Sequence, residues 1–257
     1  MWKNRTNDAL ARSVTLGPGC VFGMSHTGMI RMTNEDRYMI HELEDKSVIM
    51  AVADGLGVTS TGAHAAEMII KALSGLTHIP DDNETATLHQ LARNIDDAIY
   101  RQSRKNPYLD GMGSTLVAVL LRGQTAFWVH IGDSRLYIWS NGKLTRLTED
   151  QTLSRYLVNE KQITPEQAKT HYSQWVMDQY LGCGYAEPET GRISIADGGL
   201  LILTTDGLHT SVPEEVFLSL LNTAGDLDAR GEALVNAALN AGGQDNITVV
   251  MAQILSR

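Results

Sequence analysis

The sequence predicts an α+β domain in which antiparallel strands alternate with pairs of helices. Two observations support this fold class: short apolar, β-branched segments recur along the chain, and segments with helical spacing of apolar residues lie between them. With 257 residues and 43% hydrophobic content, the chain can bury one sizeable core, although length alone also allows two domains.

The predicted strands are short runs rich in β-branched residues, and several are apolar throughout, as expected for strands buried on both faces. They are Ser47–Ala53, Thr115–Leu121, Thr125–Ile131, Leu136–Trp139, Leu200–Thr204 and Ile247–Leu255. Asn141-Gly142 follows one of these runs, and this dipeptide favours the positive φ angles of a tight turn. We therefore expect an antiparallel hairpin around it.

The predicted helices come in two pairs. Apolar residues recur at intervals of three and four between Ala65 and Leu76 and again between Leu88 and Ile99, and the second pair covers Glu214–Leu221 and Asp226–Leu239. Each segment has one apolar face, so we expect the helices to cover a sheet.

Two segments stand apart from this pattern. Residues 149–188 carry polar helical segments and little strand signal, and Thr164-Pro165-Glu166-Gln167 has the residues of a helix start. We interpret them as a surface insertion. Residues 1–20 form a polar lead-in that ends in Gly17-Pro18-Gly19.

Charge and cysteine content exclude several classes of protein. The net charge is -9 and Lys and Arg form no run, which argues against nucleic acid or an anionic membrane as a partner. Cys20 and Cys183 match neither a disulfide framework nor a zinc or redox spacing, so we expect free thiols in a reducing compartment. Since no apolar leader or run of about 18 apolar residues is present, we predict a cytoplasmic protein, acting as a monomer.

Four aspartates stand at the ends of apolar strands. Asp54, Asp133 and Asp206 each follow a predicted strand, and Asp245 lies in a turn just before the last one. Ordinary turn chemistry explains any one of them. Brought together by sheet packing, however, they would repel each other and raise one another's pKa unless a cation neutralised them. All-oxygen ligands favour magnesium or manganese over calcium and disfavour zinc.

A further charged group precedes the short strand that begins at Arg37. It consists of Arg31 and the acidic pair Glu35 and Asp36. An arginine beside carboxylates is commonly a salt bridge. Next to a metal cluster, an arginine can instead bind substrate, because a guanidinium can hold two oxygens of a phosphoryl group.

These residues fall within six motifs that resemble the metal-dependent serine/threonine protein phosphatases of type 2C, in their compact bacterial form. In chain order the motifs are GMIRMTNEDR, VADGLG, GMGSTLVAVLL, IGDSRLYIW, LTTDGLHTSV and GGQDNITVV. Each motif is weak alone, but the six in order are a strong signal. The resemblance covers roughly residues 21–254 and implies a catalytic domain over 21–257, with the insertion of about 149–188 as its flap.

The resemblance also implies a fold and a dinuclear metal site. The expected fold is a four-layer α-β-β-α sandwich, in which two antiparallel sheets face each other between helices. Asp54 would bridge two tightly bound magnesium or manganese ions. The Gly55 carbonyl would bind the first ion, and Asp206 and Asp245 the second.

The remaining site residues have more peripheral implied roles. Glu35 and Asp36 would hold metal-bound waters or ligate directly, and Asp133 would complete, with Asp206, a labile third position. Arg31 would bind the substrate phosphate. The implied activity is hydrolysis of phosphoserine and phosphothreonine on proteins by a metal-activated water, opposing a Ser/Thr kinase.

The loop after Asp54 departs from the family pattern. It reads Leu56-Gly57-Val58-Thr59, where the family has Met-Gly-Gly-His, and Ala63 stands in place of a glutamate. His26 stands where an aspartate is common, and the flap has Asp150-Gln151 for Asp-His. The alternative function is therefore a catalytically weak relative that binds or scaffolds phosphoproteins. A third reading, an enzyme of the same fold that acts on an anti-sigma-factor antagonist, differs in partner only.

Overall fold

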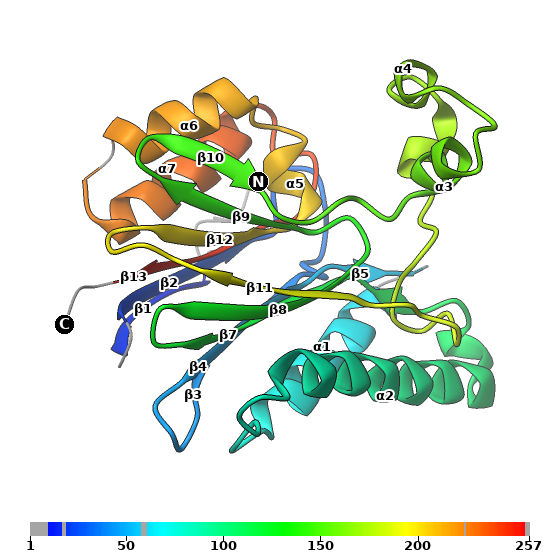
Figure 1. Ribbon diagram of the computed structural model, residues 1–257. Coiled ribbons are helices and arrows are strands. Elements are labelled where there is room, and N and C mark those ends of the chain that lie inside the picture. Colours follow the sequence, from blue (N-terminus) through cyan, green and yellow to red (C-terminus); the bar gives the residue numbers. More distant parts are fainter. Residues whose placement is uncertain (1–9, 17–18, 58–60, 224, 255–257) are drawn as a thin grey trace, which may run out of the picture.

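Figure 1 shows the computed structural model, which describes residues 10–16, 19–57, 61–223 and 225–254. Two antiparallel sheets make up its centre. In spatial order, the six-stranded sheet contains β1 (Leu10–Leu16), β2 (Gly19–His26), β13 (Ile247–Ile254), β12 (Leu200–Thr204), β9 (Arg135–Ser140) and β10 (Lys143–Arg146). The five-stranded sheet contains β11 (Glu189–Ser194), β8 (Thr125–Ile131), β7 (Leu116–Arg122), β4 (Val48–Ala53) and β3 (Arg37–Glu42). A small ribbon pairs β5 (Gly55–Leu56) with β6 (Gly113–Ser114).

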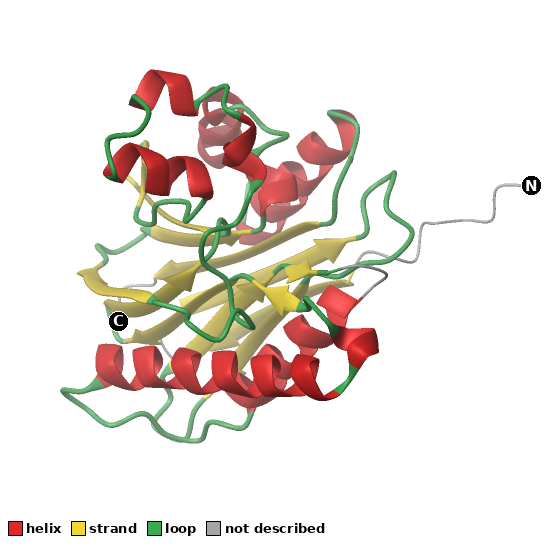
Figure 2. Cartoon of the chain, turned by 90° about the vertical axis from the view of Figure 1, so that its right-hand side faces the viewer, coloured by secondary structure: helices red, strands yellow, loops and turns green. Residues whose placement is uncertain are grey.

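Helices form the outer layers, as Figures 1 and 2 show. On the five-stranded sheet lie α1 (Thr61–Ser74) and α2 (Glu84–Lys105), followed by the short 3₁₀-helix η1 (Pro107–Leu109). On the six-stranded sheet lie α5 (Asp206–His209), α6 (Glu214–Thr223) and α7 (Leu227–Asn240). The four-layer α-β-β-α sandwich is therefore confirmed.

Strand β4 shows why the sandwich holds together. All six of its residues are buried. Because successive side chains point to opposite faces of a sheet, Ile49 and Ala51 pack in the core beneath α1 and α2, while Val48, Met50 and Val52 pack between the two sheets. Full burial of one such aliphatic side chain stabilises the fold by about 1.5 to 3 kcal/mol.

The predicted strands and helices are present, with ends that differ by a few residues. The hairpin prediction is confirmed: β9 and β10 pair from Ser140 opposite Lys143, and Asn141 and Gly142 have φ angles of 52° and 75°. Helix α4 (Pro165–Ala168) begins with the expected capping box at Thr164. Leu255, the expected last residue of the final strand, lies outside the described residues.

Two edge strands differ from the sequence interpretation. Residues 10–16, expected in the polar lead-in, form β1 and pair along their whole length with β2; residues 1–9 lie outside the described part of the chain. Strand β11 was not predicted, because it is largely exposed and has no apolar run. Edge strands of this kind are held by backbone pairing with one neighbour rather than by a buried face, so their sequences carry a weak signal.

The first part of the insertion forms a separate lobe. It contains α3 (Leu153–Asn159), α4 and the 3₁₀-helix η2 (Tyr172–Trp175), and α3 and α4 stand away from the sandwich at the right of Figure 1. The last part differs from the expected surface insertion, because Leu181, Cys183 and Ala186 are buried in the core beneath α2. We therefore refer to residues 149–177 as the flap.

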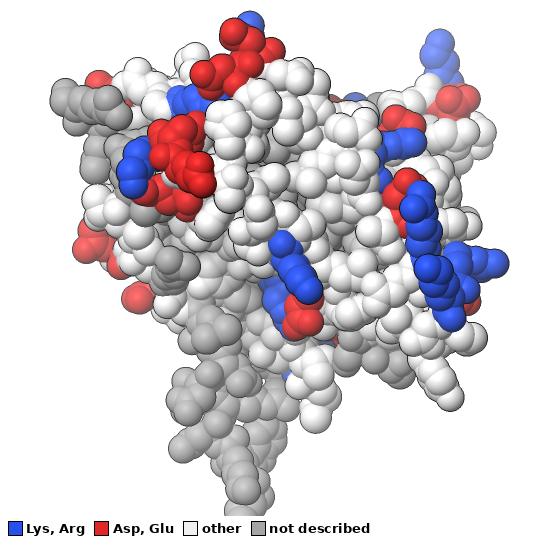
Figure 3. All heavy atoms as spheres, turned by 90° about the horizontal axis from the view of Figure 1, so that it is seen from below, with Lys and Arg blue, Asp and Glu red and all other residues white. Residues whose placement is uncertain are grey.

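Acidic and basic side chains lie close together on one face of the molecule. Figure 3 shows the face that lies at the bottom of Figure 1, where basic side chains occur in small groups, several of them beside acidic ones. In the described residues, Cys20 and Cys183 are free thiols. None of the helices described is both long and apolar enough to cross a bilayer.

Candidate metal centre

The predicted site residues meet in a cleft of about 310 Å³ at one edge of the sandwich. Its walls are formed by Arg31, Glu35, Asp54, Gly55, Leu56, Gly57, Asp133, Trp175, Met177, Asp206, Asp245 and Asn246. Every site residue predicted from the sequence is in this set except Asp36, which is buried behind it. The fold thus brings together carboxylates that are far apart in the chain.

Asp54 is placed by the end of β4. Its backbone N–H donates to the Thr115 hydroxyl at 3.0 Å, and the Thr115 N–H donates to the Asp54 carbonyl at 2.9 Å. The same hydroxyl lies 2.7 Å from that of Ser134, next to Asp133. Hydrogen bonds through the hydroxyls of Thr115 and Ser134 therefore connect the backbone of Asp54 with the residue next to Asp133.

Gly55 lies in tight contact with the start of α1. A Cβ atom on Gly55 would lie 2.3 Å from the backbone carbon of Gly62, and one on Gly62 would lie 2.5 Å from Oε2 of Glu35. Only glycine at both positions lets the backbone that follows Asp54 approach the acidic cluster this closely.

Asp206 and Asp245 are held side by side by backbone packing. Asp206 is the first residue of α5, and a Cβ atom on Gly207 would lie 2.0 Å from the carbonyl oxygen of Asn246. The Asn246 N–H donates to Oδ1 of Asp245 at 2.8 Å. The turn that carries Asp245 is thereby pressed against the start of α5.

Asp36 and Glu35 each have one carboxylate oxygen that is buried and accepts no hydrogen bond from the described residues. Oδ2 of Asp36 accepts hydrogen bonds from the hydroxyls of Thr205 at 2.8 Å and Thr248 at 2.6 Å. Within the part of the chain that the structure describes, Oδ1 of Asp36 and Oε2 of Glu35 are buried and accept no hydrogen bond. Buried carboxylate oxygens are costly when unsatisfied, so these two atoms fit a site for a cation or a cation-bound water.

The pKa values of the aspartates in the cleft show that their negative charges repel one another and are disfavoured by burial. Burial, followed by the charges of its aspartate neighbours, raises the pKa of Asp54 well above its usual value and also raises that of Asp206. Burial and the charge of Asp206 raise the pKa of Asp36 and of Asp133 to about 7. A divalent cation would remove both the repulsion and the desolvation cost of the charged forms.

The donor set of carboxylate oxygens fits such a cation. Among the described residues, no three His, Cys, Asp or Glu side chains already enclose a position for an ion. Nη2 of Arg31 donates to Oδ2 of Asp245 at 2.7 Å and so partly neutralises the cluster. The carboxylate oxygens of this cluster therefore supply the donor chemistry of a divalent cation site.

The loop that carries Arg31 is fixed to the turn after Asp245. The Asn246 side-chain amide donates to the carbonyl oxygens of Thr27 at 2.8 Å and Thr33 at 3.0 Å, and its Oδ1 accepts from the Glu35 N–H at 2.8 Å. Asn246 thus clamps both ends of the loop. The sequence interpretation missed this role, although the adjacent Asp-Asn pair offered a signal.

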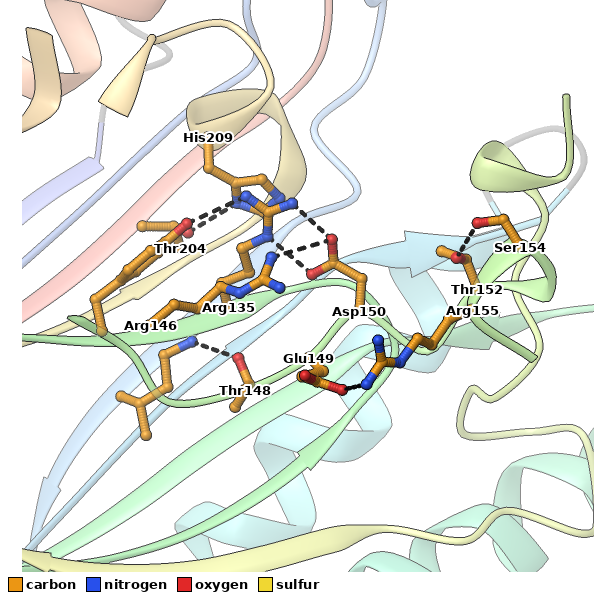
Figure 4. Close-up of polar contacts among 12 residues, drawn as sticks. Arg135, Arg146, Thr148, Glu149, Asp150, Thr152, Ser154, Arg155, Thr204 and His209 are labelled. Atoms are coloured by element: carbon orange, nitrogen blue, oxygen red, sulfur yellow. Dashed lines mark hydrogen bonds and ion pairs between the residues drawn. The ribbon is translucent and has the colours of Figure 1, made fainter. Parts of the chain in front are cut away.

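Asp133 lies instead at the root of the flap. The Gly132 N–H donates to Oε1 of Gln151 at 2.9 Å, and the Gln151 N–H donates back to the Gly132 carbonyl at 2.8 Å. Arg135 forms a two-pronged ion pair with Asp150, with distances of 2.8 and 2.6 Å (Figure 4). These contacts join the Asp133 loop to the first residues of the flap, a link that sequence reasoning did not find.

A second cavity, of about 440 Å³, is lined by residues of the flap and of the six-stranded sheet, and it shares Asp133, Trp175 and Asp206 with the cleft. Arg135, Arg146 and His209 are among the residues on its sheet side (Figure 4). Burial and then the charge of Arg135 hold the pKa of His209 well below its usual value, so it faces the cavity as a neutral group.

Comparison with known proteins identifies the family. The model of the protein phosphatase 2C family matches residues 23–241. Serine/threonine protein phosphatase PstP of Mycobacterium tuberculosis is 34% identical over 235 residues, which are 90% of this chain and 44% of that protein. Serine/threonine phosphatase stp of Listeria innocua is 32% identical over 232 residues, 88% of this chain and 92% of that protein. This chain therefore spans less than half of the mycobacterial relative and most of the other.

A solved structure extends the likeness to the fold. The catalytic domain of PstP in complex with 2 manganese ions superposes with a TM-score of 0.80 at 32% identity, over 96% of this chain and 100% of the other. Since the family model covers most of the described domain and the sandwich is shared, the chain belongs to the protein phosphatase 2C family.

Proposed function

We propose that this protein hydrolyses phosphoserine and phosphothreonine on other proteins with the help of divalent metal ions. The observation that carries the proposal is the cluster of carboxylates with two orphaned buried oxygens, on Glu35 and Asp36, beneath the guanidinium of Arg31. Support comes from relatives that are named serine/threonine phosphatases and from the manganese ions bound by one of them.

The residues that would hold the metal follow from their places in the cleft. Asp54, the Gly55 carbonyl, Asp206 and Asp245 all line this cleft. When bound, a pair of magnesium or manganese ions lowers the pKa of a water molecule and neutralises phosphate charge. In the same proposal Asp54 would contribute to the binding of both ions, and Asp133 with Asp206 would offer a third, weaker position.

Glu35 and Asp36 would act from behind the cluster. Their orphaned oxygens are suited to accept hydrogen bonds from metal-bound water or to ligate directly. Thr205 and Thr248 occupy the other oxygen of Asp36 and so fix which of its oxygens is available.

Arg31 would bind and orient the phosphate. Its side chain is 56% exposed at the mouth of the cleft, and its guanidinium can donate two parallel hydrogen bonds to phosphate oxygens. Leu56, Trp175 and Met177 line the same cleft and limit the access of bulk water. A cysteine nucleophile is not required: Cys183 is buried, and burial raises the pKa of its thiol.

Turnover of a phosphothreonine peptide in the presence of manganese tests the proposal. We expect phosphate release that stops on chelation and returns on addition of magnesium or manganese, while Cys183→Ser retains near wild-type activity. Binding of the peptide without phosphate release would contradict the proposal and favour a scaffolding relative. The altered residues Leu56 and Ala63 motivate that alternative; Val58 and Thr59 of the same loop lie outside the described residues.

The proposal includes a cellular setting: the protein opposes a Ser/Thr kinase and acts as a monomer in the cytoplasm. Light scattering of the purified protein should give the mass of one chain, 28.1 kDa. A phosphoproteome compared with and without the protein would identify the kinase substrates that it dephosphorylates.

A further inference from the structure

The loop around Arg31 exposes large apolar side chains. Met29 is 54% exposed, Ile30 is 65% exposed and Met32 is 84% exposed. In the described residues, the exposed large aliphatic side chains are Met29, Ile30, Met32, Val176 and Val216. Three of these five therefore fall within four consecutive positions, and that stretch contains the arginine at the mouth of the metal cleft. A concentration of exposed apolar surface is typical of an interaction site.

This apolar loop is held in one conformation. The Met29 N–H donates to the Gly243 carbonyl at 2.6 Å. Gly28 has a φ angle of 81°, and a Cβ atom there would lie 2.1 Å from the Asp245 carbonyl oxygen. Together with the Asn246 clamp, these contacts fix the backbone, so the exposure of the apolar side chains is a property of the fold and not of a loosely tethered loop.

Apolar side chains also line the cleft itself. They are Leu56 and, from the flap, Trp175 and Met177, and Trp175 is 71% exposed. A segment whose phosphate reaches Arg31 therefore meets apolar side chains in the cleft as well as those next to Arg31 in the apolar loop.

Distance and charge indicate which part of a substrate meets this surface. An extended chain advances about 3.3 to 3.6 Å per residue, so residues within three positions of the phosphorylated side chain lie within about 11 Å of it. Because the protein has a net charge of -9, general electrostatic attraction does not favour binding of an acidic phosphoprotein segment. Burial of apolar side chains is then the available source of affinity for the residues that flank the phosphate.

We infer that the apolar loop Met29–Met32 selects substrates with large apolar residues within three positions of the phosphorylated serine or threonine. The inference rests on the proposed phosphatase activity and names the substrate class of the same site. Ile30 and Met32 are its specificity-determining residues, since they flank Arg31 directly and are the most exposed of the three.

Two phosphothreonine peptides of equal length and charge test the inference. One carries Leu and Val at the flanking positions, and the other carries Ser and Gln. We expect kcat/KM of the wild type to favour the apolar peptide by about tenfold, which corresponds to about 1.4 kcal/mol. The combined substitutions Ile30→Thr and Met32→Gln should reduce this preference below about twofold, with an unchanged melting temperature, because neither side chain is buried.

Two controls separate this inference from general damage. Hydrolysis of p-nitrophenyl phosphate, which has no flanking residues, should be equal in the wild type and the double variant. Val216→Gln removes a partly exposed apolar side chain from α6, in the outer layer of the sandwich, and should leave the peptide preference unchanged.

Several results would overturn the inference. If the wild type hydrolyses p-nitrophenyl phosphate but dephosphorylates both peptides equally well, the inference fails while the proposed function stands. If the wild type releases phosphate from neither the peptides nor p-nitrophenyl phosphate in the presence of manganese, the proposed function itself fails and the inference with it. If the wild type is a dimer, and the double variant is a monomer that keeps the peptide preference, the apolar loop is a contact between copies of the chain.

Discussion

The two halves of the candidate metal centre are supported in different ways. Asp36, Asp206 and Asp245 are held by elements of the sandwich itself: buried threonine hydroxyls at the ends of β12 and β13, and Asn246. Asp133 depends on the root of the flap, through the contacts of Gly132 with Gln151. We refer to these as the sandwich half and the flap half.

The difference lies in what a local movement would disturb. The contacts of the sandwich half join strands that are themselves buried, so changing them requires the core to move. The contacts of the flap half join Asp133 to an insertion that stands apart from the sandwich in Figure 1. The sandwich half therefore offers candidate ligands in fixed positions, and the flap half offers one in an adjustable position.

The largest effect is expected from the sandwich half. Asp206→Asn and Asp245→Asn keep the size of each side chain but remove the charge that neutralises a divalent ion. Each should lower kcat/KM by more than about 100-fold, because loss of a residue that only hydrogen-bonds to a metal ligand already costs up to about 100-fold. Circular dichroism should show an intact fold, and Asp110→Asn, in an exposed turn, serves as the matched control. Near wild-type turnover at saturating manganese would refute the dinuclear assignment.

The flap half gives the sharpest test of the comparison. Asp133→Ala should retain two tightly bound ions in calorimetric titration, because the sandwich half is untouched, and yet lose most of the turnover, by about tenfold or more. The variant thus separates metal affinity from activity. Loss of the tight sites would show that the two halves are not independent, and full activity would show that Asp133 has no role in the reaction.

Arg31 should have a smaller effect that is divided between two kinetic constants. A guanidinium that holds phosphate in both the ground state and the transition state contributes to KM and to kcat, so Arg31→Ala should raise KM and lower kcat, each by about tenfold. Steady-state kinetics with a phosphothreonine peptide measure both. Unchanged kinetics would reduce Arg31 to a structural partner of Asp245.

The smallest effect on turnover is expected from Asp150, whose role is in stability. Asp150→Asn leaves the partly buried Arg135 without its ion pair and should destabilise the fold by about 1 to 3 kcal/mol. Although burial raises the pKa of Asp150, the hydrogen bonds and charge of Arg135 dominate and lower it. A carboxylate with a lowered folded pKa stabilises the fold above its unfolded pKa of about 3.9, and this stabilisation is lost as the pH falls through the folded value.

Denaturant melts of wild type and Asp150→Asn at pH 7 and at pH 3 therefore measure this contribution. The difference in unfolding free energy should be present at pH 7 and should shrink at pH 3. An equal difference at both values would mean that the ion pair in Figure 4 is not its source.

Local chemistry explains which parts of the fold were predictable. The Asn141-Gly142 hairpin and the capping box at Thr164 are set by residues adjacent in sequence, and both are confirmed. The buried strands β4 and β12 carry continuous apolar runs and are present as expected. Strand β11 has no such signal and exists because β8 offers it a free edge to pair with.

The candidate site divides in the same way. The order of residues along the chain predicts which carboxylates end the apolar strands, because a charge at the end of a buried run is a local pattern, and it sets Arg31 close to Glu35 and Asp36. Only the packed fold brings about their meeting in one cleft, the threonine hydrogen bonds to Asp36, the Arg135–Asp150 pair and the apolar loop beside Arg31. Each of these depends on contacts between residues distant in sequence, or on which side chains the packed fold leaves exposed, and neither quantity is a property of a local segment.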